Sequence, residues 1–151
     1  MYYKILVVES DRNLSALFER ALCVARSRSM SAGLQVFCAN SFTAAETQIS
    51  FVGANEFDLI SIGNNLPRSQ NETTNPRTAK DLIVHLNNMN VSAKVVYYGV
   101  FDQMYEQISR LTVSSLPVVT RIRWQTDSQE EGKASVRQWA DLCIDLVMRG
   151  K

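Results

Sequence analysis

The chain has 151 residues, of which 46% are hydrophobic and 21% are charged, and these ordinary proportions exclude global disorder. The length predicts a single domain, residues 1–151, that is large enough to bury a core. Sixteen Lys and Arg against 15 Asp and Glu leave a net charge of +1, which disfavours direct binding of nucleic acid.

The cysteines and the first residues of the chain predict its compartment. Cys23, Cys38 and Cys143 are far apart and odd in number, so neither a disulfide framework nor a zinc site is indicated. We expect three buried thiols in a reducing cytosol. The apolar run Ile5–Val8 is too short for a signal peptide or a membrane span, so a cytoplasmic protein without membrane contact is predicted.

Short apolar runs alternate with longer helical patterns along the whole chain. Ser41 and Thr78 are predicted as the N-caps of two of the helices. Residues 64–77 are polar, contain two prolines and show no periodicity, which indicates a connecting or binding loop. In chain order the predicted elements are a strand at 5–8, a helix at 13–26, a strand at 34–39, a helix at 42–52, a strand at 57–62, a helix at 79–86, a strand at 94–98, a helix at 103–111, a strand at 116–122 and a helix at 134–148.

Five consecutive strand–helix units predict an α/β fold. Strands joined through helices are parallel, so we expect a doubly wound, five-stranded parallel sheet with the flavodoxin-like order 2-1-3-4-5. A functional site in such a sheet lies at the carboxyl ends of strands one, three and four. In this sequence those ends are Glu9–Asp11, Gly63–Leu66 and Tyr98–Phe101.

The strand ends resemble those of bacterial response-regulator receiver domains. ILVVES is similar to the family's I-L-V-V-D-D opening, FDLISIGNNLP to its third strand and following loop, and KVVYYG to its fourth strand. The resemblance covers the chain from Lys4 to about Met148. It implies a fold that, in ordinary members, carries a phosphoacceptor carboxylate, acids that bind magnesium, a hydroxyl and a lysine.

Most of these functional positions have lost their chemistry here. The two acidic positions fall on Glu9 and Ser10, and the phosphoacceptor position falls on Gly63, which has no side chain. The hydroxyl position falls on Tyr98, which we expect to fill the pocket, and the lysine position falls near Thr120 or Arg121. Asp58 stands at the far end of the third strand, and Asp11 is expected to cap the following helix. The resemblance therefore implies a pseudo-receiver that is not phosphorylated and is not an enzyme.

Aromatic and arginine side chains gather around the ends of the fourth and fifth strands. In receivers this face is the usual docking and dimerisation surface, and such residues are enriched at interfaces. The resemblance thus implies a protein partner, namely a kinase, an output domain or a regulator in bacterial signal transduction, with a homodimer as a further alternative. The predicted contact residues are Tyr98, Phe101, Tyr105, Arg121, Arg123 and Trp124.

Two other functions remain open. The vacated pocket near Gly63, Asn64 and Tyr98 could hold a small ligand or nucleotide, which would make the protein a sensor. GNNLP also resembles, more remotely, the loop of receiver-like proteins thought to process cyclic phosphates, although Gly63 and Asn65 replace both of their acids. The single histidine, His85, is expected at the surface or the boundary of the core, and no metal or other cofactor is predicted.

Overall fold

The computed structural model describes residues 2–29, 32–53, 55–63, 66–69, 72–89, 91, 93–99, 119–123 and 129–149. The elements in these ranges are β1 Tyr2–Val8, α1 Arg12–Ser29, β2 Gly33–Ala39, α2 Phe42–Val52, β3 Leu59–Gly63, β4 Leu66–Pro67, β5 Thr74–Asn75, α3 Pro76–Asn88, β6 Lys94–Gly99, β7 Val119–Arg123 and α5 Gln129–Arg149. The predicted helix at 103–111 lies outside the described residues.

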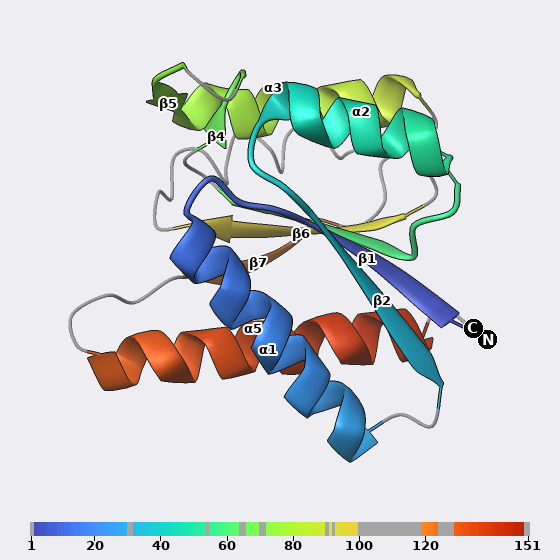
Figure 1. Ribbon diagram of the computed structural model, residues 1–151, viewed down its shortest axis with the longest axis vertical. Coiled ribbons are helices and arrows are strands. Elements are labelled where there is room, and N and C mark those ends of the chain that lie inside the picture. Colours follow the sequence, from blue (N-terminus) through green and yellow to red (C-terminus); the bar gives the residue numbers. More distant parts are fainter. Residues whose placement is uncertain are drawn as a thin grey trace.

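Five strands form one parallel sheet in the order β2-β1-β3-β6-β7. Strands β4 and β5 form a separate antiparallel ribbon. The strands of the parallel sheet, β1, β2, β3, β6 and β7, therefore correspond to the first to fifth strands of the prediction. The predicted flavodoxin-like order is therefore confirmed. Helices α1 and α5 cover one face of the sheet, and α2 and α3 cover the other (Figure 1).

The two faces of the sheet contribute to two separate cores, because side chains alternate along each strand. We call them the α1/α5 core and the α2/α3 core. The α1/α5 core takes Ile5, Val7, Leu59, Val96 and Tyr98 from the strands, together with helical side chains that include Phe18, Leu22, Trp139 and Cys143. The α2/α3 core takes Leu6, Val8, Ile60, Ile62 and Tyr97, together with Ile49, Leu82, Ile83 and Leu86.

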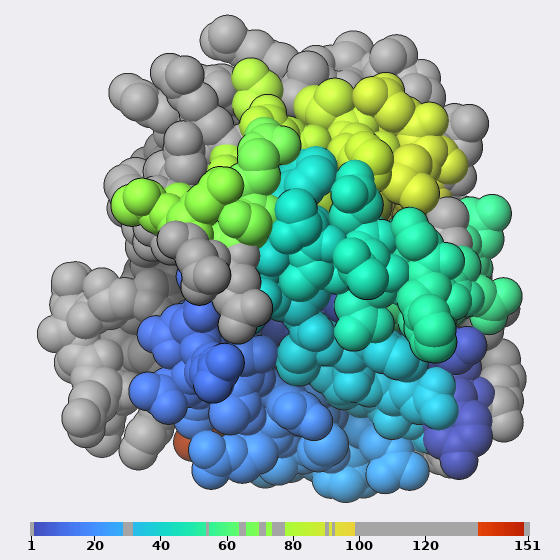
Figure 2. Space-filling view, turned by 45° about the horizontal axis from the view of Figure 1, so that its top comes forward, coloured from blue at the N-terminus to red at the C-terminus, as the bar shows by residue number. Residues whose placement is uncertain are grey.

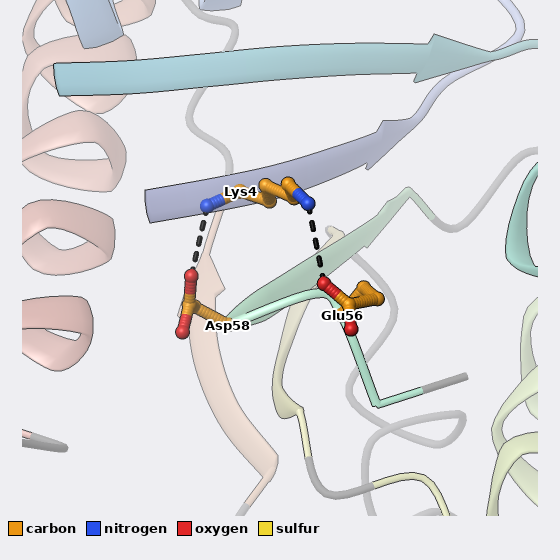
Figure 3. Close-up of polar contacts among 3 residues, drawn as sticks. All are labelled: Lys4, Glu56 and Asp58. Atoms are coloured by element: carbon orange, nitrogen blue, oxygen red, sulfur yellow. Dashed lines mark hydrogen bonds and ion pairs between the residues drawn. The ribbon is translucent and has the colours of Figure 1, made fainter. Parts of the chain in front are cut away.

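The amino-terminal ends of β1 and β3 are joined by polar contacts of Lys4. The backbone N–H of Lys4 donates to Asp58 Oδ2 at 2.8 Å (Figure 3). The Asp58 N–H donates to the Lys4 carbonyl at 2.8 Å. The Lys4 ammonium lies 3.2 Å from Glu56 Oε2. Asp58 thus fastens β1 to the start of β3, at the end of the sheet opposite Gly63, as the sequence predicts.

The starts of two helices, α3 and α5, differ from the prediction by three residues or more. Ser41 caps α2 as expected, accepting the Ala44 N–H at 3.1 Å. Thr78 is not a cap, because α3 already begins at Pro76, and proline suits the first turn of a helix, where its missing N–H has no partner to lose. Helix α5 begins at Gln129, five residues before the predicted start at residue 134.

The cysteines also differ from the expectation of three buried thiols. Cys143 is buried in the α1/α5 core, whereas Cys23 and Cys38 are exposed. Cys23 lies on the outer side of α1, and Cys38 lies on β2 at the edge of the sheet, where neighbouring elements cover less of each side chain. No helix within the described ranges is long and apolar enough to cross a membrane.

Candidate functional site

Glu9, Gly63 and Tyr98 form a row across three neighbouring strands at the carboxyl end of the sheet. Val8 pairs with Ile62 and Gly63 pairs with Tyr98, so Glu9, the residue after Val8, lies next to Gly63. Strand alternation places all three positions on the face that carries the α1/α5 core. The row therefore consists of a carboxyl group, a position without a side chain, and a phenol.

The Glu9 carboxyl occupies the space above Gly63. A Cβ atom added at Gly63 would lie less than 3.0 Å from Glu9 Oε2, a separation that real Cβ atoms essentially never show, and 3.3 Å from Glu9 Cδ. Glutamate has one methylene more than the aspartate expected at this position, and the extra length carries its carboxyl over the glycine. The Glu9 carboxyl therefore fills the space that a side chain at residue 63 would occupy.

Glu9 is buried, with only 9% of its surface exposed. Its Oε1 accepts the Asp11 N–H at 3.2 Å, and its own N–H donates to the Ala39 carbonyl at 2.9 Å. Burial raises the pKa of Glu9 from 4.5 to about 7, while the N–H donors of Asp11 and Ser10 lower it and the charge of Asp11 raises it. Near neutral pH the carboxyl is therefore divided between its protonated and ionised forms.

The other acidic groups near the strand ends do not complete a magnesium site. Asp11 Oδ1 accepts the N–H groups of Asn13 and Leu14, at 2.9 and 3.2 Å, so this carboxylate caps α1 as predicted. Ser10, at the second acidic position, carries no charge. In the described part of the chain, no group of three or more His, Cys, Asp or Glu side chains is placed to hold a metal ion.

Tyr98 fills its part of the site, as the sequence predicts. Its side chain is 3% exposed and meets the ring of Phe18 edge-on, with ring centroids 4.9 Å apart. Phe18 in turn stacks on Trp139, whose Nε1–H donates to Ser61 Oγ at 2.8 Å. Burial and the nearby Glu9 raise the pKa of the Tyr98 phenol well above its ordinary value.

This burial corrects one part of the predicted docking surface. A side chain that makes contact with a partner must be exposed, so Tyr98 belongs to the α1/α5 core and not to that surface. Arg121 and Arg123 lie on β7, the strand at one edge of the sheet. Phe101, Tyr105 and Trp124 lie outside the described residues.

The register of β7 locates the two candidates for the lysine position. Thr120 pairs with Val96 and Arg121 pairs with Tyr97, whereas the residue opposite Tyr98 is Ile122. Thr120 and Arg121 therefore stand two residues and one residue short of the row along β7. The residue level with the row is Ile122, which has no charge to offer a phosphoryl group.

A surface hollow of about 530 Å³ lies on the β2 side of Glu9. It is lined by Glu9, Arg12, Ser15, Cys38, Ala39, Asn40, Ser41, Thr43, Ala44, Thr47 and Gln48. Gly63 and Tyr98 do not line it, so the hollow is not the vacated phosphorylation pocket that the sequence suggested for a ligand. Sequence reasoning missed it because it depends on how the N-termini of α1 and α2 come together.

His85 has an acidic neighbour that the sequence pattern did not reveal. Its Nε2 lies 3.2 Å from Glu46 Oε2 on α2, and its ring lies 5.6 Å from that of Phe42. The histidine side chain is about one third exposed, as expected for the boundary of the core. The contact joins α2 to α3, on the face of the sheet opposite to the row.

Similar folds occur among solved structures, at low sequence identity. The Mn²⁺-bound response regulator Rcp1 matches with a TM-score of 0.64 and 14% identity over 90% of each chain. A response-regulator receiver domain from Rhodospirillum rubrum matches with a TM-score of 0.62 and 17% identity over 94% of each chain. A structure described as representing redox sensors in the streptococci that evolved from two-component response regulators matches with a TM-score of 0.55 and 16% identity, over 99% of this chain and 55% of that one.

No protein-family model matches the sequence, and a search of curated proteins finds no significant match. The likeness therefore concerns architecture. The chain has the fold of response-regulator receiver domains, and the resemblance predicted from its strand ends is confirmed at that level.

Proposed function

We propose that this chain is a single receiver-like domain, residues 1–151, that does not accept a phosphoryl group and acts by binding a protein partner. It would work without enzymatic activity in the cytoplasm, in bacterial signal transduction or regulation. The partner would be a kinase, an output domain or another regulator. The proposal concerns recognition because the receiver fold is retained while the acceptor position, Gly63, has no nucleophile.

The Glu9 carboxyl above Gly63 is the observation that supports this proposal most strongly. It fills the space in which an acceptor and its phosphoryl group would stand, since even a Cβ at Gly63 would be too close to it. The Glu9 carboxyl is also partly protonated near neutral pH, which weakens it as a ligand for Mg²⁺. Steric occupation and the missing nucleophile both oppose phosphorylation.

Incubation with acetyl phosphate, or with beryllofluoride and Mg²⁺, tests the loss of phosphorylation. We expect no added phosphoryl mass and no change in melting temperature, with an intact receiver domain as the positive control in the same buffers. The Glu9→Asp, Gly63→Asp double variant is the matched comparison, because it shortens one carboxyl and restores the other. Covalent phosphorylation of the wild-type chain would refute the proposal.

The protein-binding part of the proposal uses the edge of the sheet at β7, with Arg121, Arg123 and Trp124 as predicted contacts. Immobilised wild-type chain and the Tyr105→Ala and Trp124→Ala variants would be compared for capture of proteins from a native lysate. We expect both variants to capture less of the same partner. Undiminished capture by both would remove this surface from the proposal.

A small-ligand sensor is the second candidate, and the hollow beside Glu9 is what favours it. Hydroxyl and amide side chains line it, including Ser15, Asn40 and Thr43, and such groups fix the orientation of polar ligands. A thermal-shift screen with nucleotides and small metabolites tests it, with Thr43→Val as the variant that should lose the response. A ligand that raises the melting temperature of both proteins equally would bind elsewhere.

A further inference from the structure

The edge strand β2 lacks the features that usually prevent one sheet from pairing with another. Proteins protect exposed edges with charges, prolines, bulges or very short strands. β2 is seven residues long, and its sequence, GLQVFCA, contains no charged residue and no proline. The opposite edge, β7, has five residues, two of which are arginines. The two edges of the same sheet therefore differ in their resistance to pairing.

β2 lies at the molecular surface. Within the described residues it pairs with β1 only, and Figure 2 shows its atoms in the strip between α1 and α2. Gln35 and Cys38 are exposed, and the strand from Gly33 to Phe37 contains no fully buried residue. The outer side of β2 is thus accessible to another strand.

The hydrogen bonds of β2 show which residues face outward. The Ala39 carbonyl accepts the Glu9 N–H, so Ala39 directs its backbone groups toward β1. Because backbone groups alternate in direction along a strand, Leu34, Val36 and Cys38 direct theirs away from β1. The side chains of Leu34 and Val36 are only partly buried, and both pack against the α1/α5 core. The three residues whose backbone groups face outward, Leu34, Val36 and Cys38, have apolar or thiol side chains. These side chains lie on the same face of the sheet.

We propose that β2 pairs with β2 of a second copy of this chain, antiparallel and with the two-fold axis at Val36. This register places Val36 opposite itself and Leu34 opposite Cys38 of the second copy. Each of the three pairs exchanges two backbone hydrogen bonds, which satisfies the outward-facing groups of the strand. No like charges meet, and the half-buried apolar side chains cover one another.

A second copy suits this edge better than an unrelated peptide does. A symmetric interface brings the same surface of both copies together. In this register Val36 meets Val36, Leu34 meets Cys38 and Gln35 meets Phe37 of the second copy, so no charged residue of β2 is placed in the interface. The two five-stranded sheets would then form one continuous sheet. The interface uses the edge opposite to β7 and does not depend on the loss of phosphorylation.

Sedimentation equilibrium of the full chain over a wide concentration range tests the proposal. We expect the mass to rise from 17.0 kDa toward twice that value. Val36→Lys and Val36→Glu each place like charges opposite one another at the axis, which should weaken association by on the order of tenfold. An equal mixture of these two variants should associate again. Leu17→Lys, which makes the same kind of change at a residue on α1 that is 45% exposed, should leave the mass unchanged.

Disulfide trapping tests the register and introduces no charged residue into β2. It therefore remains decisive if the Val36 variants do not fold. In a Cys23→Ser background, Leu34→Cys should crosslink to Cys38 of the second copy under mild oxidation. Gln35→Cys, one residue away and opposite Phe37, should not. A chain that stays monomeric at every concentration would overturn the proposal. A dimer that persists in both the Val36→Lys and Val36→Glu variants would also overturn it. Equal crosslinking of Leu34→Cys and Gln35→Cys would overturn the register.

Discussion

Replacing Gly63 with alanine should destabilise the protein because the new methyl group meets the Glu9 carboxyl. The added Cβ would lie less than 3.0 Å from Oε2 and 3.3 Å from Cδ, so the carboxyl must move. Overpacking of this kind costs about 1–3 kcal/mol. Gly→Ala within a strand otherwise stabilises by roughly 0.5–1 kcal/mol, so we expect a net loss of about 1–2 kcal/mol.

The same substitution should behave differently once the carboxyl is removed. In a Glu9→Ala background the space above residue 63 is open, and Gly63→Ala is then expected to be neutral or slightly stabilising. The coupling between the two sites should be about 2 kcal/mol, well above the roughly 0.5 kcal/mol scatter of independent sites. Urea unfolding at pH 7, followed by tryptophan fluorescence, measures each corner of the cycle.

Glu56→Ala provides the matched control, because Glu56 is exposed and lies at the opposite end of β3. In that background Gly63→Ala should cost as much as it does in the wild-type chain. An equal cost of Gly63→Ala with and without the Glu9 carboxyl would mean that the two groups do not meet. The steric argument against phosphorylation would then fail.

Three further outcomes are expected. The pKa of Glu9 is about 7 in the folded chain and 4.5 ordinarily, so between these pH values the folded state binds a proton that the unfolded state has lost. The free energy of unfolding should therefore fall by about 3 kcal/mol as the pH rises from about 4.5 to 7. Denaturant titrations should show that Glu9→Gln removes this contribution, and an unchanged pH profile would contradict it. Trp139→Phe leaves the buried Ser61 hydroxyl without its donor and should cost about 1–3 kcal/mol in thermal unfolding, whereas Ser61→Ala added to it should cost little more. Asp11→Ala removes the cap of α1 and should cost about 1 kcal/mol by the same measurement, while Asp11→Asn should keep most of the stability.

The sheet was predictable because its signals are local and strong. Continuous apolar runs such as Ile5–Val8 identify buried strands, and strands connected through helices must run parallel. Five such units fit a doubly wound sheet with the flavodoxin-like order 2-1-3-4-5. Successive residues of a strand point to opposite faces of the sheet, and this places Tyr97 and Tyr98 in different cores, as observed. The assignment of Gly63 to the acceptor position stays a prediction, and it needs only the alignment of one strand end.

The occupation of the space above Gly63 by the Glu9 carboxyl was not predictable in the same way. The sequence shows that Glu9 is longer than aspartate, but whether its carboxyl turns toward Gly63 depends on the register between β1 and β3. The ribbon of β4 and β5 within residues 64–77 was missed because two-residue strands leave no periodic pattern. The predicted start of α3 is wrong because Thr78 is a typical cap, whereas Pro76 belongs to a polar stretch without periodicity.

The carboxyl above Gly63 bears on how such a domain could evolve. A mutation that introduced aspartate at residue 63 alone would force two acidic groups into one buried space, where like charges oppose ionisation. A mutation that shortened Glu9 alone would leave a void and restore no chemistry. A carboxylate acceptor at residue 63 therefore requires both changes together, because neither single substitution by itself produces a favourable site.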